Sequence, residues 1–194
     1  KIKEKVAEGK WEAGGGMWVE ADCNLSSGES LVRQFLHGTR FFEEEFGKKC
    51  EYLWLPDVFG YSWALPQILK QCELDTFMTT KISWNQYNTI PDDLFKWKGI
   101  DGTEILTYFV DTPEVGHTPK QRFSTYNGLI TQHAVIGNLK KFKNKELTQN
   151  TLLSYGYGDG GGGVNREMLE MRRAMDKLPG VPNLKTMQAT DFFH

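Results

Sequence analysis

The stretch that decides the fold passes from a short apolar run into a turn; it reads Glu51-Tyr52-Leu53-Trp54-Leu55-Pro56-Asp57-Val58-Phe59-Gly60-Tyr61-Ser62. Downstream of the turn, Leu65, Ile68 and Leu69 recur at helical spacing. Pro66 falls in the first turn of this helix, where its missing N–H costs little. The stretch therefore predicts a strand, a turn and a helix in direct succession, which is the building unit of an α/β fold.

The same order of elements recurs along the chain. Further apolar runs that we interpret as strands cover residues 17–19, 76–80, 104–110, 151–155 and 185–189. Helical periodicity predicts helices from the capping-box pair Ser26 and Glu29 to Phe46, over about residues 129–142 and over about residues 165–177. Gly47 is the predicted stop of the first of these helices, and Thr190 or Asp191 is expected to cap a last one. Strands that alternate with helices in this way favour a parallel sheet with right-handed crossovers.

Composition limits the kind of protein. The chain has 194 residues, a formal net charge of -2, 39% hydrophobic residues and 25% charged residues, which is typical of a soluble globular domain. No apolar run approaches the roughly 20 residues that would cross a bilayer, so no membrane partner is predicted. The near-neutral charge provides no broad basic field, so nucleic acid is not a predicted partner either.

Three cysteines, Cys23, Cys50 and Cys72, form neither a disulfide framework nor a C-x-x-C metal motif. Reduced thiols in a cytoplasmic protein are the simplest interpretation. The chain opens on Lys1 rather than on methionine, which is expected of an interior part of a longer protein.

Polar residues follow the predicted strands. Asp22, Asp57, Lys81 and Asp159 each come just after an apolar run, and in a parallel α/β architecture they would face the same rim of the sheet. The alternative for each aspartate is that it only caps the following helix. Asp57 is the strongest candidate, because Ser62 is closer to the start of its helix and can cap it.

Two carboxylates on one rim are the raw requirement for cleaving a glycoside. One serves as the nucleophile, for which we take Asp57, and the other as general acid and then base, for which we take Asp159. The aromatic residues Trp54, Phe59, Tyr61 and Trp63 could offer aromatic surface to the C–H face of a sugar, or could belong to the core. Trp54, on the strand itself, is expected in the core. The separation of the carboxylates, which decides the stereochemical outcome, does not follow from the sequence.

The glycine-rich loop at residues 158–163 suggests a phosphate cradle, but it lacks both the G-K-[ST] ending of a P-loop and the spacing of a dinucleotide site. Its glycines more simply let the backbone approach a ligand while Asp159 points inward. The four histidines have no metal-ligand spacing.

Several long motifs, in the right order, resemble the catalytic domain of the glycoside hydrolase family 38 α-mannosidases, in their bacterial and cytosolic branch. They cover about residues 10–165 and comprise Gly15-Gly16-Met17-Trp18-Val19-Glu20, Ser27-Gly28-Glu29-Ser30-Leu31-Val32-Arg33-Gln34, residues 54–62, Leu65-Pro66-Gln67-Ile68-Leu69-Lys70, Lys81-Ile82-Ser83-Trp84-Asn85-Gln86, Gly99-Ile100-Asp101-Gly102-Thr103 and the glycine loop.

The resemblance implies a retaining, zinc-dependent exo-α-mannosidase that acts on α-mannoside glycans or oligosaccharides through a glycosyl-enzyme intermediate. It implies one Zn²⁺ ion and a seven-stranded (β/α) barrel of which residues 1–194 are a part, with no separate second domain. Asp57 matches the nucleophile, which is also a metal ligand, and Asp159 matches the acid/base. Phe59 and Lys81 match substrate-binding residues of the pocket.

Some family features do not occur in the chain. The remaining zinc ligands of the family are an H-x-D pair, expected upstream of Lys1, and the histidine of an H-D motif, expected downstream of His194. Ala21 and Val164 stand where relatives often have proline. We therefore expect that residues 1–194 alone neither bind zinc tightly nor turn over substrate. An incomplete barrel leaves open sheet edges, so we also expect the isolated chain to be poorly soluble or to form a homo-oligomer.

Two other functions remain open at this level. The first is a catalytically silent, carbohydrate-binding relative, which a missing H-x-D upstream would favour. The second is a metal-free α/β hydrolase or nucleotide binder built on the glycine loop, which insensitivity to chelators would favour.

Overall fold

The computed structural model describes residues 1–85, 87–113, 124–158 and 161–194. The chain forms two compact units. Unit 1 consists of residues 1–79, 95–108 and 187–194, and unit 2 consists of residues 80–94 and 109–186. Each unit contains its own cluster of buried apolar side chains.

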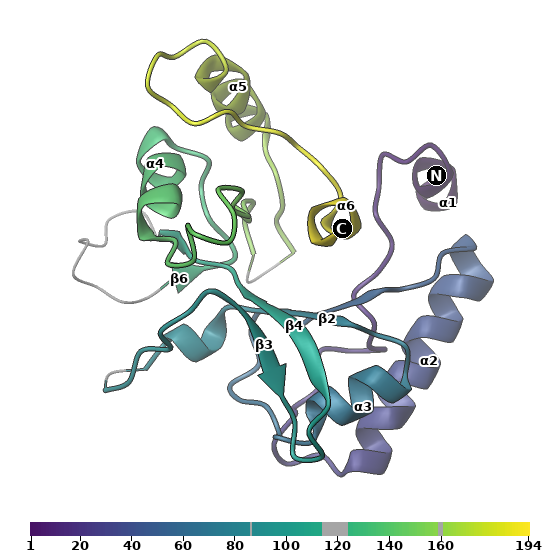
Figure 1. Ribbon diagram of the computed structural model, residues 1–194. Helices are drawn as coiled ribbons and strands as arrows, with labels where there is room; N and C mark the ends of the chain where they lie inside the picture. Colours follow the sequence, from purple (N-terminus) through teal and green to yellow (C-terminus); the bar gives the residue numbers. More distant parts are fainter. Residues whose placement is uncertain (86, 114–123, 159–160) are drawn as a thin grey trace. The chain divides into compact units, whose positions relative to one another are not determined.

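The main sheet has the strand order β1-β2-β4-β3, with bounds Tyr52–Trp54 for β1, Thr76–Thr79 for β2, Leu94–Lys98 for β3 and Glu104–Phe109 for β4 (Figure 1). β1 and β2 are parallel, and α3 (Leu65–Gln71) connects them, so the predicted strand–turn–helix stretch is confirmed. Only residues 99–103 connect β3 to β4. Parallel neighbours need a much longer crossover, so β3 and β4 form an antiparallel hairpin. The α/β class is confirmed, and this hairpin is the exception to the predicted parallel arrangement.

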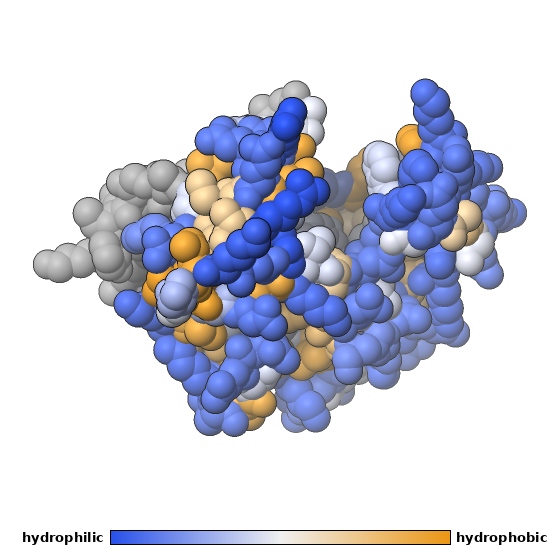
Figure 2. Space-filling model, turned by 90° about the horizontal axis from the view of Figure 1, so that it is seen from above, coloured by the Kyte–Doolittle hydropathy of each residue, from blue (hydrophilic) through white to orange (hydrophobic). Residues whose placement is uncertain are grey.

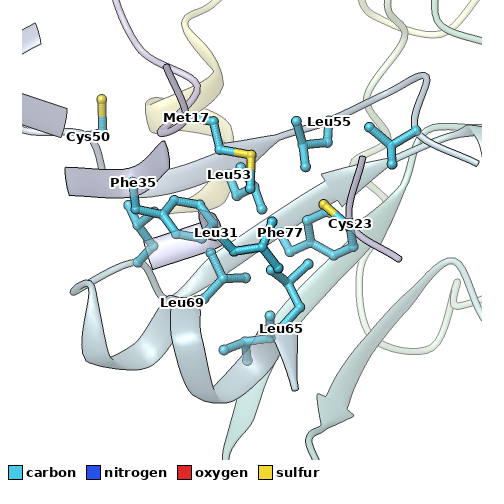
Figure 3. Packing of buried hydrophobic residues seen from close by; sticks show 13 residues of the cluster. Met17, Cys23, Leu31, Phe35, Cys50, Leu53, Leu55, Leu65, Leu69 and Phe77 are labelled. Carbon is cyan, nitrogen blue, oxygen red and sulfur yellow. The ribbon is translucent and has the colours of Figure 1, made fainter. Parts of the chain in front are cut away.

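The core of unit 1 lies where α2 (Gly28–Phe46) and α3 pack against the sheet (Figure 3). Leu53 of β1 pairs in register with Phe77 of β2, and both side chains are buried in this cluster together with Leu31 and Phe35 of α2. The predicted start of α2 is shifted by one residue, because Ser27 rather than Ser26 accepts the capping hydrogen bond, from Ser30 N–H. The predicted stop at Gly47 is confirmed.

The side chains that alternate with this core point to the second face of the sheet. There the rings of Tyr52 and Tyr108 contact Phe193 and Phe192 of α6 (Ala189–Phe193), at ring-centroid distances of 5.6 and 5.2 Å. The N-terminal helix α1 (Ile2–Ala7), which was not among the predicted helices, also belongs to unit 1.

Three predicted strands are wrong. Residues 17–19 form no ladder, because Gln34 of α2 accepts the main-chain N–H of Trp18 with its carbonyl oxygen and that of Val19 with its side chain. In the run 151–155, Tyr155 forms only an isolated bridge with Gly128. Residues 185–188 are irregular and lead into α6. Short apolar runs become strands only where a neighbouring strand offers a ladder.

Unit 2 contains a short helix η1 (Lys81–Ser83), the antiparallel pair β5 (Thr112–Pro113) and β6 (Ser124–Thr125), and helices α4 (Gln132–Lys141) and α5 (Arg166–Met175). These two helices fall within the two predicted ranges. Its core consists of Ile130, Val135, Met168 and Met175.

The molecular face in Figure 2 is mostly hydrophilic, with hydrophobic side chains scattered among polar ones. Such isolated exposed apolar residues are normal for a globular protein. Among the described residues, none of the helices combines the length and the apolar character that crossing a bilayer requires.

Candidate active site

Asp57 lies three residues after Trp54, the last residue of β1. Leu55 N–H donates the final ladder-type hydrogen bond, to Met78 O at 3.1 Å. Pro56 has no N–H to donate. The N–H of Asp57 donates to Oε1 of Glu20 at 2.8 Å, and the Asp57 side chain is half-buried. The carboxylate therefore sits at the carboxyl end of a parallel strand, on a backbone that has a specific side-chain acceptor.

The far side of the same loop is held by Tyr61. Its hydroxyl lies 2.8 Å from Leu55 O and 2.6 Å from Thr79 Oγ1, and burial raises the pKa of this phenol. Ser62 N–H donates to Cys23 O at 3.1 Å, within a bridge that pairs Cys23 with Tyr61. Residues 55–62, which we call the Asp57 loop, are thus fixed at both ends.

The helix-capping alternative for Asp57 is not what the structure shows. α3 begins after Ala64, and the N–H of Ala64 donates to Ser62 Oγ at 3.2 Å. Ser62 thus accepts a main-chain N–H of the turn before α3, but the helix itself has no side-chain cap, so the predicted capping by Ser62 is wrong.

Two aromatic side chains near Asp57 are open to solvent rather than buried in the core. Phe59 is 80% exposed, and Trp63 is 62% exposed while its indole N–H donates to Lys98 O at 3.0 Å. Tyr61, by contrast, packs edge-on against Phe77 in the core. Phe59 is therefore the aromatic side chain of this loop that is most available to a ligand.

A cavity of about 440 Å³ lies in unit 1 beside the Asp57 loop. Its walls include Leu55 and Pro56 from the loop, the carboxylate-bearing Glu20, and the aromatic side chains of Trp18 and Trp54. Aromatic faces together with a carboxylate suit a sugar ring, which has both C–H and hydroxyl surfaces.

The other predicted rim residues are Asp22, Lys81 and Asp159. Asp22 is exposed, and its Oδ1 accepts the N–H groups of Asn24 at 2.9 Å and Leu25 at 2.6 Å, which lowers its pKa. In the structure the Asp22 side chain therefore stabilises a turn, which is a structural role and not the catalytic role considered for a rim carboxylate. Lys81 begins η1 in unit 2, with its Nζ 4.0 Å from the ring centroid of Trp84. Asp159 lies outside the described residues.

The whole chain, residues 1–194, matches the family model described as the glycosyl hydrolases family 38 N-terminal domain. The chain belongs to glycosyl hydrolase family 38. It is 41% identical over 193 residues to alpha-mannosidase G of Dictyostelium discoideum, covering 100% of this chain and 17% of that protein. It is 40% identical to the alpha-mannosidase of Saccharomyces cerevisiae, covering 98% of this chain and 17% of the relative. The family 38 chain thus spans about a sixth of the length of these curated relatives.

Two solved structures share the fold of this family 38 chain. One, described as an alpha-mannosidase from Enterococcus faecalis V583, has a TM-score of 0.62 at 20% identity and covers 91% of this chain and 19% of its own. The other, a glycosyl hydrolase family 38 protein from Enterococcus faecalis, has a TM-score of 0.64 at 18% identity, with coverages of 99% and 19%. At these identities the likeness concerns the fold alone.

The described residues of the family 38 chain do not make up a metal site. In this part of the chain there is no group of three or more histidine, cysteine, aspartate or glutamate side chains that could hold a metal ion. A catalytic zinc site usually takes three protein ligands, and Asp57 could supply one of them.

Three residues that hold the Asp57 loop of the family 38 chain escaped the sequence analysis in this role: Glu20, Tyr61 and Thr79. Glu20 is 37 positions from Asp57, and no local spacing links them. The sequence indicates Tyr61 only as a sugar-facing or core aromatic residue. Its position six residues after Leu55 in the same turn was the one available signal.

Proposed function

We propose that the whole protein is a retaining, zinc-dependent exo-α-mannosidase with Asp57 as its nucleophile. Family membership supports this proposal, as do the relatives that are named alpha-mannosidases. The structural observation that carries it is the half-buried Asp57 carboxylate, held at the end of β1 beside a cavity with aromatic walls.

In the proposed reaction the Asp57 carboxylate attacks the anomeric carbon of the terminal mannose while a second carboxyl group protonates the departing glycosidic oxygen. We assign the second role to Asp159. The same residue then deprotonates a water molecule, which hydrolyses the mannosyl ester on Asp57 and frees the carboxylate. Phe59, with its 80% exposed ring, is assigned to the C–H face of the sugar, and Lys81 to the sugar hydroxyls.

The proposal includes one zinc ion, for which Asp57 is the ligand that this chain provides. The other ligands then come from residues outside the described part of the chain, within a complete seven-stranded (β/α) barrel. Zinc supplies Lewis-acid polarisation and a fixed anchor for substrate oxygens when it is bound. Incubation of the full-length protein with a chelator is expected to abolish activity, and added Zn²⁺ is expected to restore it. Residues 1–194 alone are expected to show no turnover.

The decisive experiment replaces Asp57 in the full-length protein. Asp57→Asn should lower kcat on an aryl α-mannoside by about a thousandfold or more, because the amide cannot form the ester, while the circular dichroism spectrum stays unchanged. Mass spectrometry after rapid denaturation during turnover should find a mannosyl adduct on the peptide that contains Asp57. Full activity in Asp57→Asn would refute the proposal. Binding of mannosides without turnover by the metal-loaded wild type would instead indicate a catalytically silent relative.

We also propose a cytoplasmic location, which the three free cysteine thiols support, because reduced thiols are typical of that compartment.

A further inference from the structure

Main-chain N–H groups help to hold the backbone at the start of the Asp57 loop. Leu55 N–H donates to Met78 O, and Pro56 has no N–H. The N–H of Asp57 is therefore the next main-chain donor that can fix the backbone. Its acceptor is the Glu20 carboxylate, at 2.8 Å. A hydrogen bond to an ionised acceptor is roughly twice as strong as one between neutral groups.

Glu20 is itself held between two fixed points. On its N-terminal side, Trp18 N–H donates to Gln34 O and Val19 N–H donates to Gln34 Oε1, both at 3.0 Å, which ties this segment to α2. On its C-terminal side, Cys23 O accepts Ser62 N–H at 3.1 Å. The carboxylate of Glu20 is therefore presented to Asp57 from a segment that is anchored on both sides.

We propose that Glu20 is a positioning residue for Asp57. Its carboxylate fixes the main chain from which the Asp57 side chain projects, so that the Asp57 carboxylate meets the anomeric carbon without first ordering its own backbone. This inference rests on the proposed function, because holding Asp57 affects catalysis only where Asp57 reacts. Glu20 also lines the cavity, so direct contact with the sugar is the competing role that the experiment must separate.

The side chain of Glu20 is exposed, so its truncation leaves no hole in the core. In the full-length protein, Glu20→Ala is expected to lower kcat on an aryl α-mannoside by about 10- to 100-fold, as is common for residues that orient a reacting group. The KM is expected to change by less than about threefold. Glu20→Gln keeps an oxygen that can accept the Asp57 N–H, so it is expected to retain most of the kcat.

The matched control is Glu44→Ala. Glu44 is an exposed glutamate of α2 whose carboxylate pairs with Arg40 at 2.6 Å, and its loss should leave kcat and KM unchanged. A second measurement does not depend on activity: hydrogen exchange of the Asp57 amide should be at least about tenfold faster in Glu20→Ala than in the wild type and in Glu20→Gln.

The outcomes separate the two proposals. Unchanged kcat in Glu20→Ala, together with loss of activity in Asp57→Asn, would overturn the role of Glu20 and leave the proposed function intact. A raised KM with unchanged kcat would also overturn it, in favour of sugar contact. Full activity in Asp57→Asn would overturn the proposed function and with it the catalytic role of Glu20, whatever the amide exchange shows.

Discussion

The hydroxyl oxygens of Tyr61 and Thr79 lie 2.6 Å apart, and the Tyr61 hydroxyl is also 2.8 Å from Leu55 O. Tyrosine has one hydroxyl proton, so Tyr61 donates to the carbonyl and Thr79 donates to Tyr61. Thr79 is the last residue of β2, and Leu55 directly follows β1. This chain of hydrogen bonds thus ties together the carboxyl ends of two parallel strands, at the point where the Asp57 loop begins.

Removal of this hydroxyl is expected to loosen the loop. Tyr61→Phe leaves the Leu55 carbonyl without this donor and the buried Thr79 hydroxyl without its acceptor, at a cost of about 1–3 kcal/mol. Hydrogen exchange of the β1 and β2 amides in the full-length protein should accelerate by about 5- to 150-fold as a result. Tyr87→Phe is the control, because Tyr87 is 86% exposed. Equal protection of these amides from exchange in the wild type and in Tyr61→Phe would show that the Tyr61 hydroxyl does not hold the two strand ends together.

Gly38 allows the segment before Glu20 to lie directly against α2. A Cβ atom built at this position would approach Met17 C to 2.4 Å, Gly16 O to 2.5 Å and Trp18 N to 2.6 Å. All three are backbone atoms, which cannot rotate away. Gly38→Ala is therefore expected to destabilise unit 1 by about 1–3 kcal/mol, although alanine is the better helix former.

A fall in the apparent melting temperature of the full-length protein would test this expectation. Gly47→Ala is the comparison. Gly47 has a φ of 62° and no atom within 4 Å of a built Cβ, so its substitution costs only backbone strain, about 1–2 kcal/mol. Unchanged stability in Gly38→Ala would show that the segment moves freely away from the helix.

Local signals in the sequence predicted the parts of the fold that local physics decides. The periodicity of α2, its Gly47 stop and the β1–α3–β2 succession all follow from residues close together in the chain. The segment at residues 17–19 was mispredicted as a strand, because its hydrogen-bond partner is Gln34 rather than a neighbouring strand. The strand β3 was missed because its side chains, Leu94 to Lys98, are mostly half-buried and show no clean alternation.

For the candidate site, the sequence predicted Asp57 as a strand-end carboxylate and Phe59 as an available aromatic residue, and the structure places both on the Asp57 loop. The same rule failed at Asp22, which follows no strand and closes a turn. Glu20 could not be found this way, because its contact with Asp57 depends on how two distant segments pack.

The thiol of Cys23 is expected to be unreactive in the folded protein. Burial raises its pKa to about 12, with a further rise from the nearby carboxylates of Asp22 and Glu20, and the residue is 0% exposed. At pH 8 the thiolate, which is the reactive form, is scarce. Iodoacetamide followed by peptide mass spectrometry should label partly exposed Cys72 before Cys23, and both equally after denaturation.

The same raised pKa links stability to pH. The folded state holds the Cys23 proton more tightly than the unfolded state, whose thiol ionises near pH 9. The stabilising contribution is therefore complete below about pH 9 and is lost as the pH rises from there to about 12. Cys23→Ala should flatten this part of the stability profile. An unchanged alkaline profile would indicate that the thiol is solvated.

Glu12 connects the N-terminal segment of unit 1 to its C-terminal helix. Its carboxylate accepts the N–H groups of Ala189 at 2.6 Å and Thr190 at 2.9 Å, and also the Thr190 hydroxyl at 2.8 Å. The N-cap residue of α6, Gln188, makes no side-chain cap of its own, so Glu12 caps this helix from a distance of more than 170 residues along the chain. A negative charge at a helix N-terminus is favourable.

Glu12→Ala is expected to release α6 from the sheet. The loss of a helix cap costs about 0.5–2 kcal/mol, and α6 carries Phe192 and Phe193 onto Tyr108 and Tyr52. The amides of residues 188–194 should therefore exchange about 2- to 30-fold faster in the full-length protein, while those of α2 keep their protection. In Glu12→Gln the exchange rate of these amides should lie between the rates in the wild type and in Glu12→Ala, because one accepting oxygen remains. Glu8→Ala is the control, since the Glu8 carboxylate pairs with Lys5 and Lys10 and its loss should leave α6 protected. Equal exchange of residues 188–194 in Glu12→Ala and Glu8→Ala would mean that the aromatic contacts alone hold α6 in place.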